Sequence, residues 1–67
     1  MTKKVRELIQ VLEEHDWYFV RERGDHKIYK KKGCKRSVSV PGKMSKDIKV
    51  GLYYRILRET GIKTKNN

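Results

Sequence analysis

The order of its hydrophobic periods is the feature of this sequence that most constrains its fold. Apolar residues recur at helical spacing towards both ends of the chain, and between them lie three short segments that alternate polar and apolar residues, as β-strands do. All of this falls within 67 residues, which leaves room for one apolar layer shared by helices and sheet. We therefore expect a single domain over residues 1–62 and a disordered tail over residues 63–67.

The first helical period predicts an amphipathic helix from about Lys3 to His15, with Thr2 as its N-cap. Its apolar face follows the i, i+3, i+4, i+7 spacing of Val5, Leu8, Ile9 and Leu12. The opposite face carries several glutamates, which would repel phosphate groups. We expect this helix to pack against the sheet and to take no part in binding a polyanion.

Three strands are predicted over residues 17–22, 26–31 and 35–40. Gly24 and Asp25 form a tight turn between the first two strands, and a short loop joins the second to the third, so the sheet is antiparallel.

The alternation within the strands indicates which side chains meet the helices. Both faces of the first strand are partly apolar, and we place Trp17 and Phe19 on the face towards the helices. In the third strand Val38 and Val40 share the apolar face, while the serines between them face solvent. Pro41 and Gly42 end this strand.

The second helical period predicts a helix that begins at Ser45 as N-cap, with Asp47 in its first turn. Gly61 is suited to its C-terminus, where Ile62 would fold back onto the helix, and Gly51 is expected to let the helix approach its neighbours closely. The resulting order is α-β-β-β-α, with both helices on one face of a three-stranded antiparallel sheet. This α+β arrangement resembles double-stranded RNA-binding domains, which is an analogy of fold and not of function.

Charge is the strongest compositional signal. The chain has 18 Lys and Arg residues against 8 Asp and Glu, which gives a formal net charge of +10. The excess is concentrated in residues 21–49, so the predicted sheet and its loops carry most of the positive field. A polyanionic partner is the natural inference.

Other site classes find little support. Cys34 is the single cysteine, so it makes no internal disulfide, and together with His15 and His26 it lacks the ligand spacing of a zinc site. We expect neither a metal nor another cofactor. The apolar stretches are too short to span a membrane and the N-terminus lacks a signal-peptide core, so a cytoplasmic protein is expected.

Three local signatures, in register along the chain, carry a resemblance to a known family. The first runs from an aromatic through an arginine into a Gly-x-His turn, here Trp17, Arg21, Gly24, Asp25 and His26. The second is the Val-Pro segment that closes the third strand, residues 38–41. The third is a glycine-containing helix with a closing Gly-Ile, here Gly51, Leu52, Arg55, Ile56, Leu57, Gly61 and Ile62. Together they resemble the HicA toxins of toxin–antitoxin pairs over nearly the whole chain.

Two positions depart from the usual family pattern. Asp25 stands where the family commonly has Ser before the histidine, and Asp16 stands where it commonly has Gly before the aromatic. Aspartate tolerates turn and left-handed geometry, so both replacements are physically acceptable. Asp25 also places a negative charge beside His26, where it could orient the ring or weaken the approach of RNA.

The resemblance implies a metal-independent endoribonuclease that cleaves single-stranded mRNA and is silenced by a HicB-like antitoxin protein covering its active surface. His26 is then the catalytic acid or base, supported by the turn of Gly24 and Asp25. Cations would hold the phosphates and an aromatic would stack on a base. The expected RNA-binding residues are Arg21, Arg23, Lys27, Tyr29, Lys30, Lys43 and Lys46.

Two alternatives remain open at this point: a non-catalytic double-stranded-RNA-binding module, and a small basic protein that binds DNA or ribosomal RNA for structural reasons. A lone histidine at a strand start is more often a surface residue than a catalyst. The run Lys30–Lys32 also has an alternative interpretation as a solvated hairpin tip, because runs of charge usually serve only to keep a surface soluble. His15, near the end of the first helix, is interpreted as a structural or merely exposed side chain, and Cys34 as an exposed loop thiol without a catalytic role.

Overall fold

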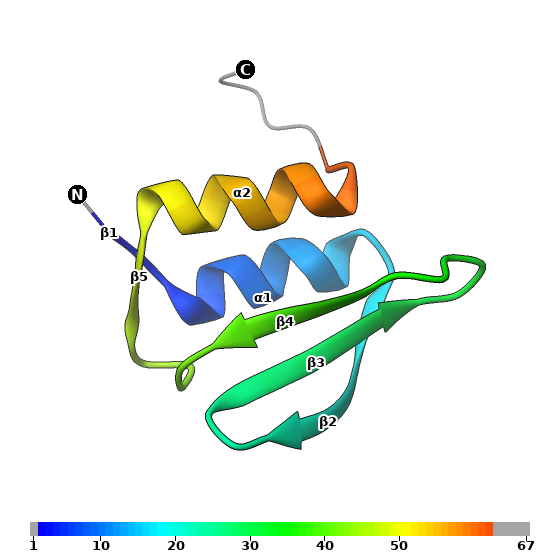
Figure 1. Cartoon of the computed structure of the whole chain (residues 1–67). Coiled ribbons are helices and arrows are strands. Elements are labelled where there is room, and N and C mark those ends of the chain that lie inside the picture. Colours follow the sequence, from blue (N-terminus) through cyan, green and yellow to red (C-terminus); the bar gives the residue numbers. More distant parts are fainter. Residues whose placement is uncertain (1, 63–67) are drawn as a thin grey trace.

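Both helices cover one face of a three-stranded sheet (Figure 1). The computed structural model describes residues 2–62, and the predicted tail at 63–67 lies outside them. The elements in chain order are β1 (Thr2–Lys4), α1 (Val5–Glu14), β2 (Trp17–Arg23), β3 (His26–Lys31), β4 (Ser37–Pro41), β5 (Asp47–Lys49) and α2 (Val50–Thr60). The sheet has the strand order β2-β3-β4 and both pairings are antiparallel. The predicted α+β class and element order are therefore confirmed.

A second, two-stranded sheet was not predicted. The short strands β1 and β5 pair antiparallel, with Lys3 opposite Ile48. The Nζ atom of Lys4 lies 2.7 Å from Oδ1 of Asp47 and adds an exposed ion pair across the same two strands. This pairing ties the chain just before α1 to the chain just before α2.

The pairing explains why both predicted helix starts are wrong. Residues 2–4 belong to β1, so α1 begins at Val5, and the backbone N–H of Lys4 donates to Oε2 of Glu7 at 2.7 Å. Ser45 and Asp47 do not start a helix, because Ile48 is buried in β5 and α2 begins only at Val50. In both cases a strand pair satisfies the backbone groups that the predicted first turn would have used.

The C-terminus of α2 follows its prediction. Gly61 has φ of 77°, in the left-handed region, and its N–H donates to the carbonyl of Arg58 at 3.1 Å. Ile62 folds back, donates its N–H to the carbonyl of Leu57 at 3.0 Å and is buried. The expectation for Gly51 is wrong, since a Cβ built there would meet no atom within 4 Å.

A β-bulge in β2 decides which of its side chains face the helices. Phe19 lies opposite Tyr29, but Arg21 lies opposite Ile28, so one extra residue is inserted at Val20. Trp17 is buried as predicted, whereas Phe19 sits at the rim of the apolar layer and remains 48% exposed. Beyond the bulge the alternation is shifted by one residue, which moves Arg21 to the face away from the helices.

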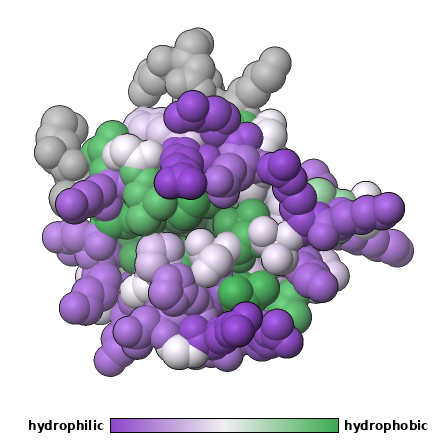
Figure 2. Space-filling view, viewed as in Figure 1, coloured by the Kyte–Doolittle hydropathy of each residue, from purple (hydrophilic) through white to green (hydrophobic). Residues whose placement is uncertain are grey.

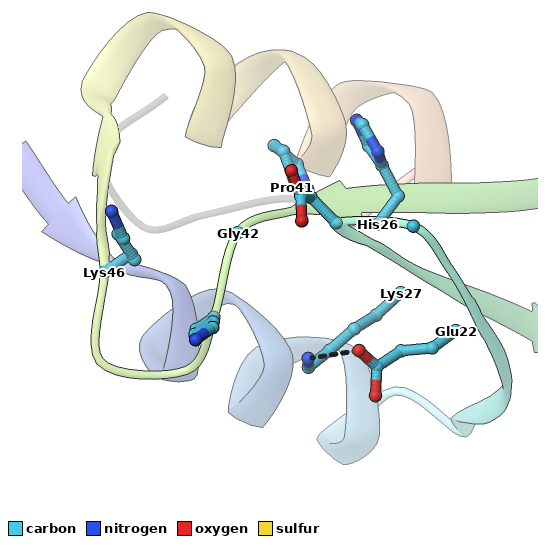
Figure 3. Close-up of a pocket in the computed structure, with 9 residues that line it drawn as sticks. Glu22, His26, Lys27, Pro41, Gly42 and Lys46 are labelled. Carbon is cyan, nitrogen blue, oxygen red and sulfur yellow. Dashed lines mark ion pairs between the residues drawn. The ribbon is translucent and has the colours of Figure 1, made fainter.

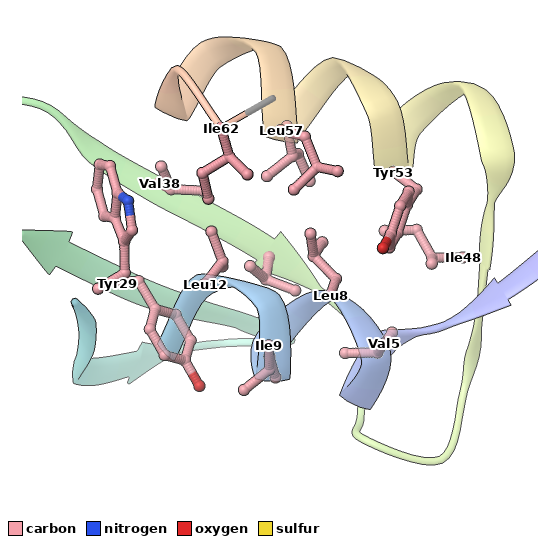
Figure 4. Packing of buried hydrophobic residues seen from close by; sticks show 13 residues of the cluster. Val5, Leu8, Ile9, Leu12, Tyr29, Val38, Ile48, Tyr53, Leu57 and Ile62 are labelled. Atoms are coloured by element: carbon pink, nitrogen blue, oxygen red, sulfur yellow. The ribbon is translucent and has the colours of Figure 1, made fainter. Parts of the chain in front are cut away.

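The apolar core lies between the sheet and the two helices (Figure 4). Val38 and Val40 of β4 point into it, as the alternation predicted. The buried set is completed by Val5, Leu8, Ile9, Leu12, Trp17, Tyr29, Ile48, Tyr53, Ile56, Leu57 and Ile62. Because this core occupies one face of the sheet, the other face and the strand ends are left for function.

Candidate functional site

A hollow of about 490 Å³ opens where the β2–β3 turn meets the end of β4 (Figure 3). The residues that line it come from two short segments of the chain, one around the turn and one after β4. They are Glu22, Gly24, Asp25, His26, Lys27, Pro41, Gly42, Lys43 and Lys46. Six of these nine were predicted site residues: Gly24, Asp25, His26, Lys27, Lys43 and Lys46.

Backbone contacts hold the two segments together. His26 is the first residue of β3 and lies opposite both Arg23 of β2 and Pro41 of β4. The N–H of Gly42 donates to the carbonyl of Asp25 at 2.9 Å, which ties the turn to the chain leaving β4. Gly24 turns the chain with φ of 61°, a left-handed conformation that favours glycine.

The imidazole of His26 is exposed and lines the hollow. Figure 3 shows its ring and the Lys27 side chain leaving the strand in opposite directions, as strand alternation requires. The hollow therefore wraps around the end of β3 and includes atoms from both of its faces. Within residues 2–62 the structure shows no hydrogen bond and no ion pair to this ring, so both of its nitrogens are free to meet a ligand.

Three lysines and two acids set the charge of the hollow. The side chain of Lys27 is only 16% exposed, and its Nζ lies 3.9 Å from Oε2 of Glu22. Lys43 and Lys46 are exposed, and a backbone hydrogen bond of 2.9 Å from the N–H of Lys46 to the carbonyl of Lys43 holds them in one turn. Asp25 is the second acid and reduces the positive charge beside His26.

The other predicted cations lie on the sheet face away from the helices. Residues directly opposite in an antiparallel pair share a face, so Arg23 lies on the same face as His26, and Arg21 lies there with Ile28. Lys30 also belongs to this face, opposite Tyr18 of β2 and Ser37 of β4. This outer face, residues 18, 21, 23, 26, 28 and 30, leads from the hollow along the length of the sheet.

Tyr29 requires a correction, because the structure places it in the core. The side chain is 3% exposed, and its ring meets Phe19 edge to face at 5.8 Å between centroids. Burial, reinforced by the nearby carboxylate of Glu13, raises the pKa of its hydroxyl. No face of the ring is free for a nucleobase, so the predicted stacking on Tyr29 does not fit this fold. Tyr18 and Phe19 are the aromatics of β2 that are half exposed.

Sequence reasoning missed three residues that line the hollow: Glu22, Pro41 and Gly42. Glu22 was only an alternating polar residue, and its place beside Lys27 follows from the shifted register after the bulge. Pro41 and Gly42 were interpreted as turn formers, and the hydrogen bond from Gly42 to Asp25 makes them a wall of the hollow as well. In the sequence, the Val-Pro-Gly segment followed by two lysines was the signal that could have indicated this wall of the hollow.

Fold and hollow together define a small basic α+β domain with the helix and sheet arrangement of double-stranded RNA-binding domains and an exposed histidine at the end of its sheet. The sequence profile of the HicA toxin of bacterial toxin–antitoxin systems matches residues 5–62. The chain therefore belongs to the HicA toxin family. A search of curated proteins finds no match to the chain. Neither of the helices described is long and apolar enough to cross a membrane.

Proposed function

We propose that this toxin is an endoribonuclease that cleaves single-stranded mRNA in the cytoplasm, with His26 as the group that moves a proton. The observation that carries the proposal is the exposed imidazole of His26 lining a hollow that also contains Lys27, Lys43 and Lys46. RNA supplies its own nucleophile, the 2′-OH, so the reaction needs no metal-activated water. It needs a base for that proton and cations for the phosphate.

The proposed reaction transfers the phosphate within the RNA. His26 accepts the proton of the 2′-OH, and the 2′ oxygen attacks the adjacent phosphorus. The bond from phosphorus to the 5′ oxygen of the next nucleotide breaks, and that oxygen takes up a proton from solvent water, while His26 returns its proton to solvent. The products are a 2′,3′-cyclic phosphate and a 5′-OH. A histidine suits the first step because free imidazole titrates near pH 6.5, close to the working pH.

The lysines of the hollow have different surroundings and so different expected roles. Lys27 is mostly enclosed and its side chain leaves β3 on the opposite side from the His26 ring, so we assign it to the positive field of the hollow and not to direct contact with the phosphorus at which His26 acts. Lys43 and Lys46 are exposed on a loop and are suited to binding the phosphates on either side of the cut. Arg21, Arg23 and Lys30 would bind the strand as it continues along the outer face.

The proposed protein partner is a HicB-like antitoxin. Such a protein would silence the toxin by covering the hollow and the outer face, whose cations require an acidic complement. Membership of a family of toxins from toxin–antitoxin systems supports this partner. The chemistry of the surface supports an acidic interface.

The test is a comparison of His26→Ala with His15→Ala. Both histidines are exposed, but His15 caps the C-terminus of α1, where its Nδ1 lies 2.9 Å from the carbonyl of Val11. We expect His26→Ala to lower the rate of cleavage of single-stranded RNA by roughly 100-fold or more, and to leave RNA affinity nearly unchanged. His15→Ala should cut like the wild type. Equal cleavage by wild type and His26→Ala, with EDTA present throughout, would overturn the assignment.

One alternative function is an outcome of the test: the element order resembles that of double-stranded RNA-binding domains, although a shared fold does not by itself carry a shared function. A non-catalytic module of that class would prefer duplex RNA to single strands and would cut neither. Gel-shift titrations with one sequence, single-stranded and annealed, separate the two functions. The ribonuclease proposal requires tighter binding of the single strand.

A further inference from the structure

The β3–β4 hairpin carries a second concentration of cations, far from the hollow. We define the distal hairpin as residues 30–36. It contains Lys30, Lys31, Lys32, Lys35 and Arg36. Figure 1 places its loop at the opposite end of the sheet from the β2–β3 turn, where His26 lies. In Figure 2, viewed as in Figure 1, hydrophilic side chains project from the side of the molecule where this loop lies.

The charge of the distal hairpin is not balanced within the described part of the chain. No acidic residue occurs between Asp25 and Asp47, and the ion pairs shown within residues 2–62 join other elements. Five cations in seven residues repel one another, so this segment is more favourable with an anion bound than without one.

The loop is also a defined turn. Gly33 has φ of 83°, and the N–H of Cys34 donates to the carbonyl of Lys31 at 3.0 Å. Lys32 is exposed on this turn, and Lys35 and Arg36 are exposed in the segment that joins the turn to β4. The turn places Lys32 directly after β3, and β4 begins at Ser37 directly after Arg36, so these cations lie at the end of the sheet away from His26.

We propose that the distal hairpin is a second phosphate-binding site, which holds the RNA strand several nucleotides away from the strand position at His26. This rests on the RNA-binding part of the proposed function and deepens it by setting a minimum substrate length. β3 separates His26 from Lys31 by about 17 Å at about 3.4 Å per residue. A stacked strand carries a phosphate every 3.4 Å or so, so about five nucleotides span the two sites. Shorter RNAs reach only one of them.

The experiment measures binding with all-2′-O-methyl oligonucleotides of 4 and 12 nucleotides, which lack the nucleophile and are not cut. The hairpin variant carries Lys32→Gln, Lys35→Gln and Arg36→Gln. Its matched control removes the same charge from exposed positions around α2, with Lys49→Gln, Arg55→Gln and Arg58→Gln. Circular dichroism melts verify that both variants fold.

We expect the hairpin variant to bind the 12-mer more weakly by on the order of 10- to 100-fold at 0.1 M salt, with a salt slope reduced by about 2, because up to three phosphate contacts are lost. Its affinity for the 4-mer should change far less, because the 4-mer still binds at the hollow. The control variant should bind both oligonucleotides within a factor of about 3 of the wild type, because none of its three positions lines the hollow or belongs to the distal hairpin.

Two results would overturn the second site. In the first, both variants bind the 12-mer equally weakly. In the second, the hairpin variant loses the same factor of affinity for the 4-mer as for the 12-mer. Cleavage of unmodified RNA by the wild type is measured alongside. If the wild type cuts nothing while the length-dependent difference is present, the nuclease proposal fails and the second site stands. If it cuts and the difference is absent, only the second site fails.

Discussion

One backbone angle fixes the junction between α1 and β2. Asp16 has φ of 71°, in the left-handed region, and it directly precedes the buried Trp17. Left-handed geometry costs an ordinary L-residue about 1–2 kcal/mol, and aspartate is among the few residues that adopt it readily. The interpretation of Asp16 as a substitute for glycine therefore agrees with its conformation.

We predict that Asp16→Gly leaves the stability unchanged or slightly higher, and that Asp16→Val lowers the free energy of unfolding by about 1–2 kcal/mol relative to Asp16→Gly. Urea unfolding of both variants measures the difference. The same two substitutions at Lys35, an exposed loop residue without a positive φ, provide the control and should not show this order. Equal stability of Asp16→Gly and Asp16→Val would contradict the role of the angle.

Tyr29 and Glu22 show that the sequence did not determine on which face of the sheet a side chain lies. The alternation of β3 was visible, but it did not show which face of the strand meets the helices, so Tyr29 was assigned to RNA when it belongs to the core. The bulge at Val20 has no glycine or other local marker, and it alone brings Glu22 opposite Lys27. Both errors concern a face, which depends on packing between elements and not on local preference.

At the scale of elements, local chemistry was predictable and distant pairing was not. The α2 terminus at Gly61 and Ile62 follows from one turn of chain, and the β2–β3 turn from two residues. In contrast β1 and β5 are three-residue strands from distant parts of the chain, too short to show a period. Their pairing changed both helix starts and gave Ser45 and Asp47 structural surroundings that no local rule indicates.

The corrected start of α2 gives a direct prediction. If Ser45 were an N-cap, Ser45→Ala would cost about 1 kcal/mol. Because Ser45 lies in the loop before β5, we expect a change within about 0.5 kcal/mol. Glu7→Ala is the positive counterpart and should cost about 1 kcal/mol, because its carboxylate accepts the N–H of Lys4 at the start of α1. Chemical denaturation measures the free energy of unfolding of the two variants. A larger decrease from Ser45→Ala than from Glu7→Ala would support the helix start that the sequence predicted at Ser45.

At the scale of the whole molecule, the hollow could be predicted in large part because its two segments are joined by short connections. A tight turn and one antiparallel hairpin suffice to bring the start of β3 beside the end of β4, so His26, Lys27, Lys43 and Lys46 were recognisable as neighbours. The second basic region was visible as a run of charge, but its separation from His26 required the direction of β3. The sequence therefore predicted which residues make up the basic surface, but it did not show that they form two separate regions at opposite ends of the sheet.

The net charge of +10 gives stability and RNA binding opposite responses to salt. The ion pairs described within residues 2–62 are solvent-exposed or, for Lys27 and Glu22, long at 3.9 Å, so they offset little of the mutual repulsion. Raising sodium chloride from about 0.05 to 0.5 M screens that repulsion and should raise Tm by a few degrees, since 1 kcal/mol corresponds to about 4–8 °C in a domain of this size. RNA affinity should fall steeply over the same range. Binding releases counterions from the RNA, and the entropy gained by that release becomes smaller as the salt concentration rises.

Thermal melts and binding titrations with the 12-mer, in the same buffers, measure the two responses. The variant with Lys49→Gln, Arg55→Gln and Arg58→Gln has three fewer positive charges, so its Tm should rise less with salt than that of the wild type, while its RNA salt slope stays the same. A Tm that falls with salt would mean that ion pairs, and not repulsion, dominate the electrostatic stability of the fold. An anionic partner would then not be needed to relieve charge repulsion in the free protein.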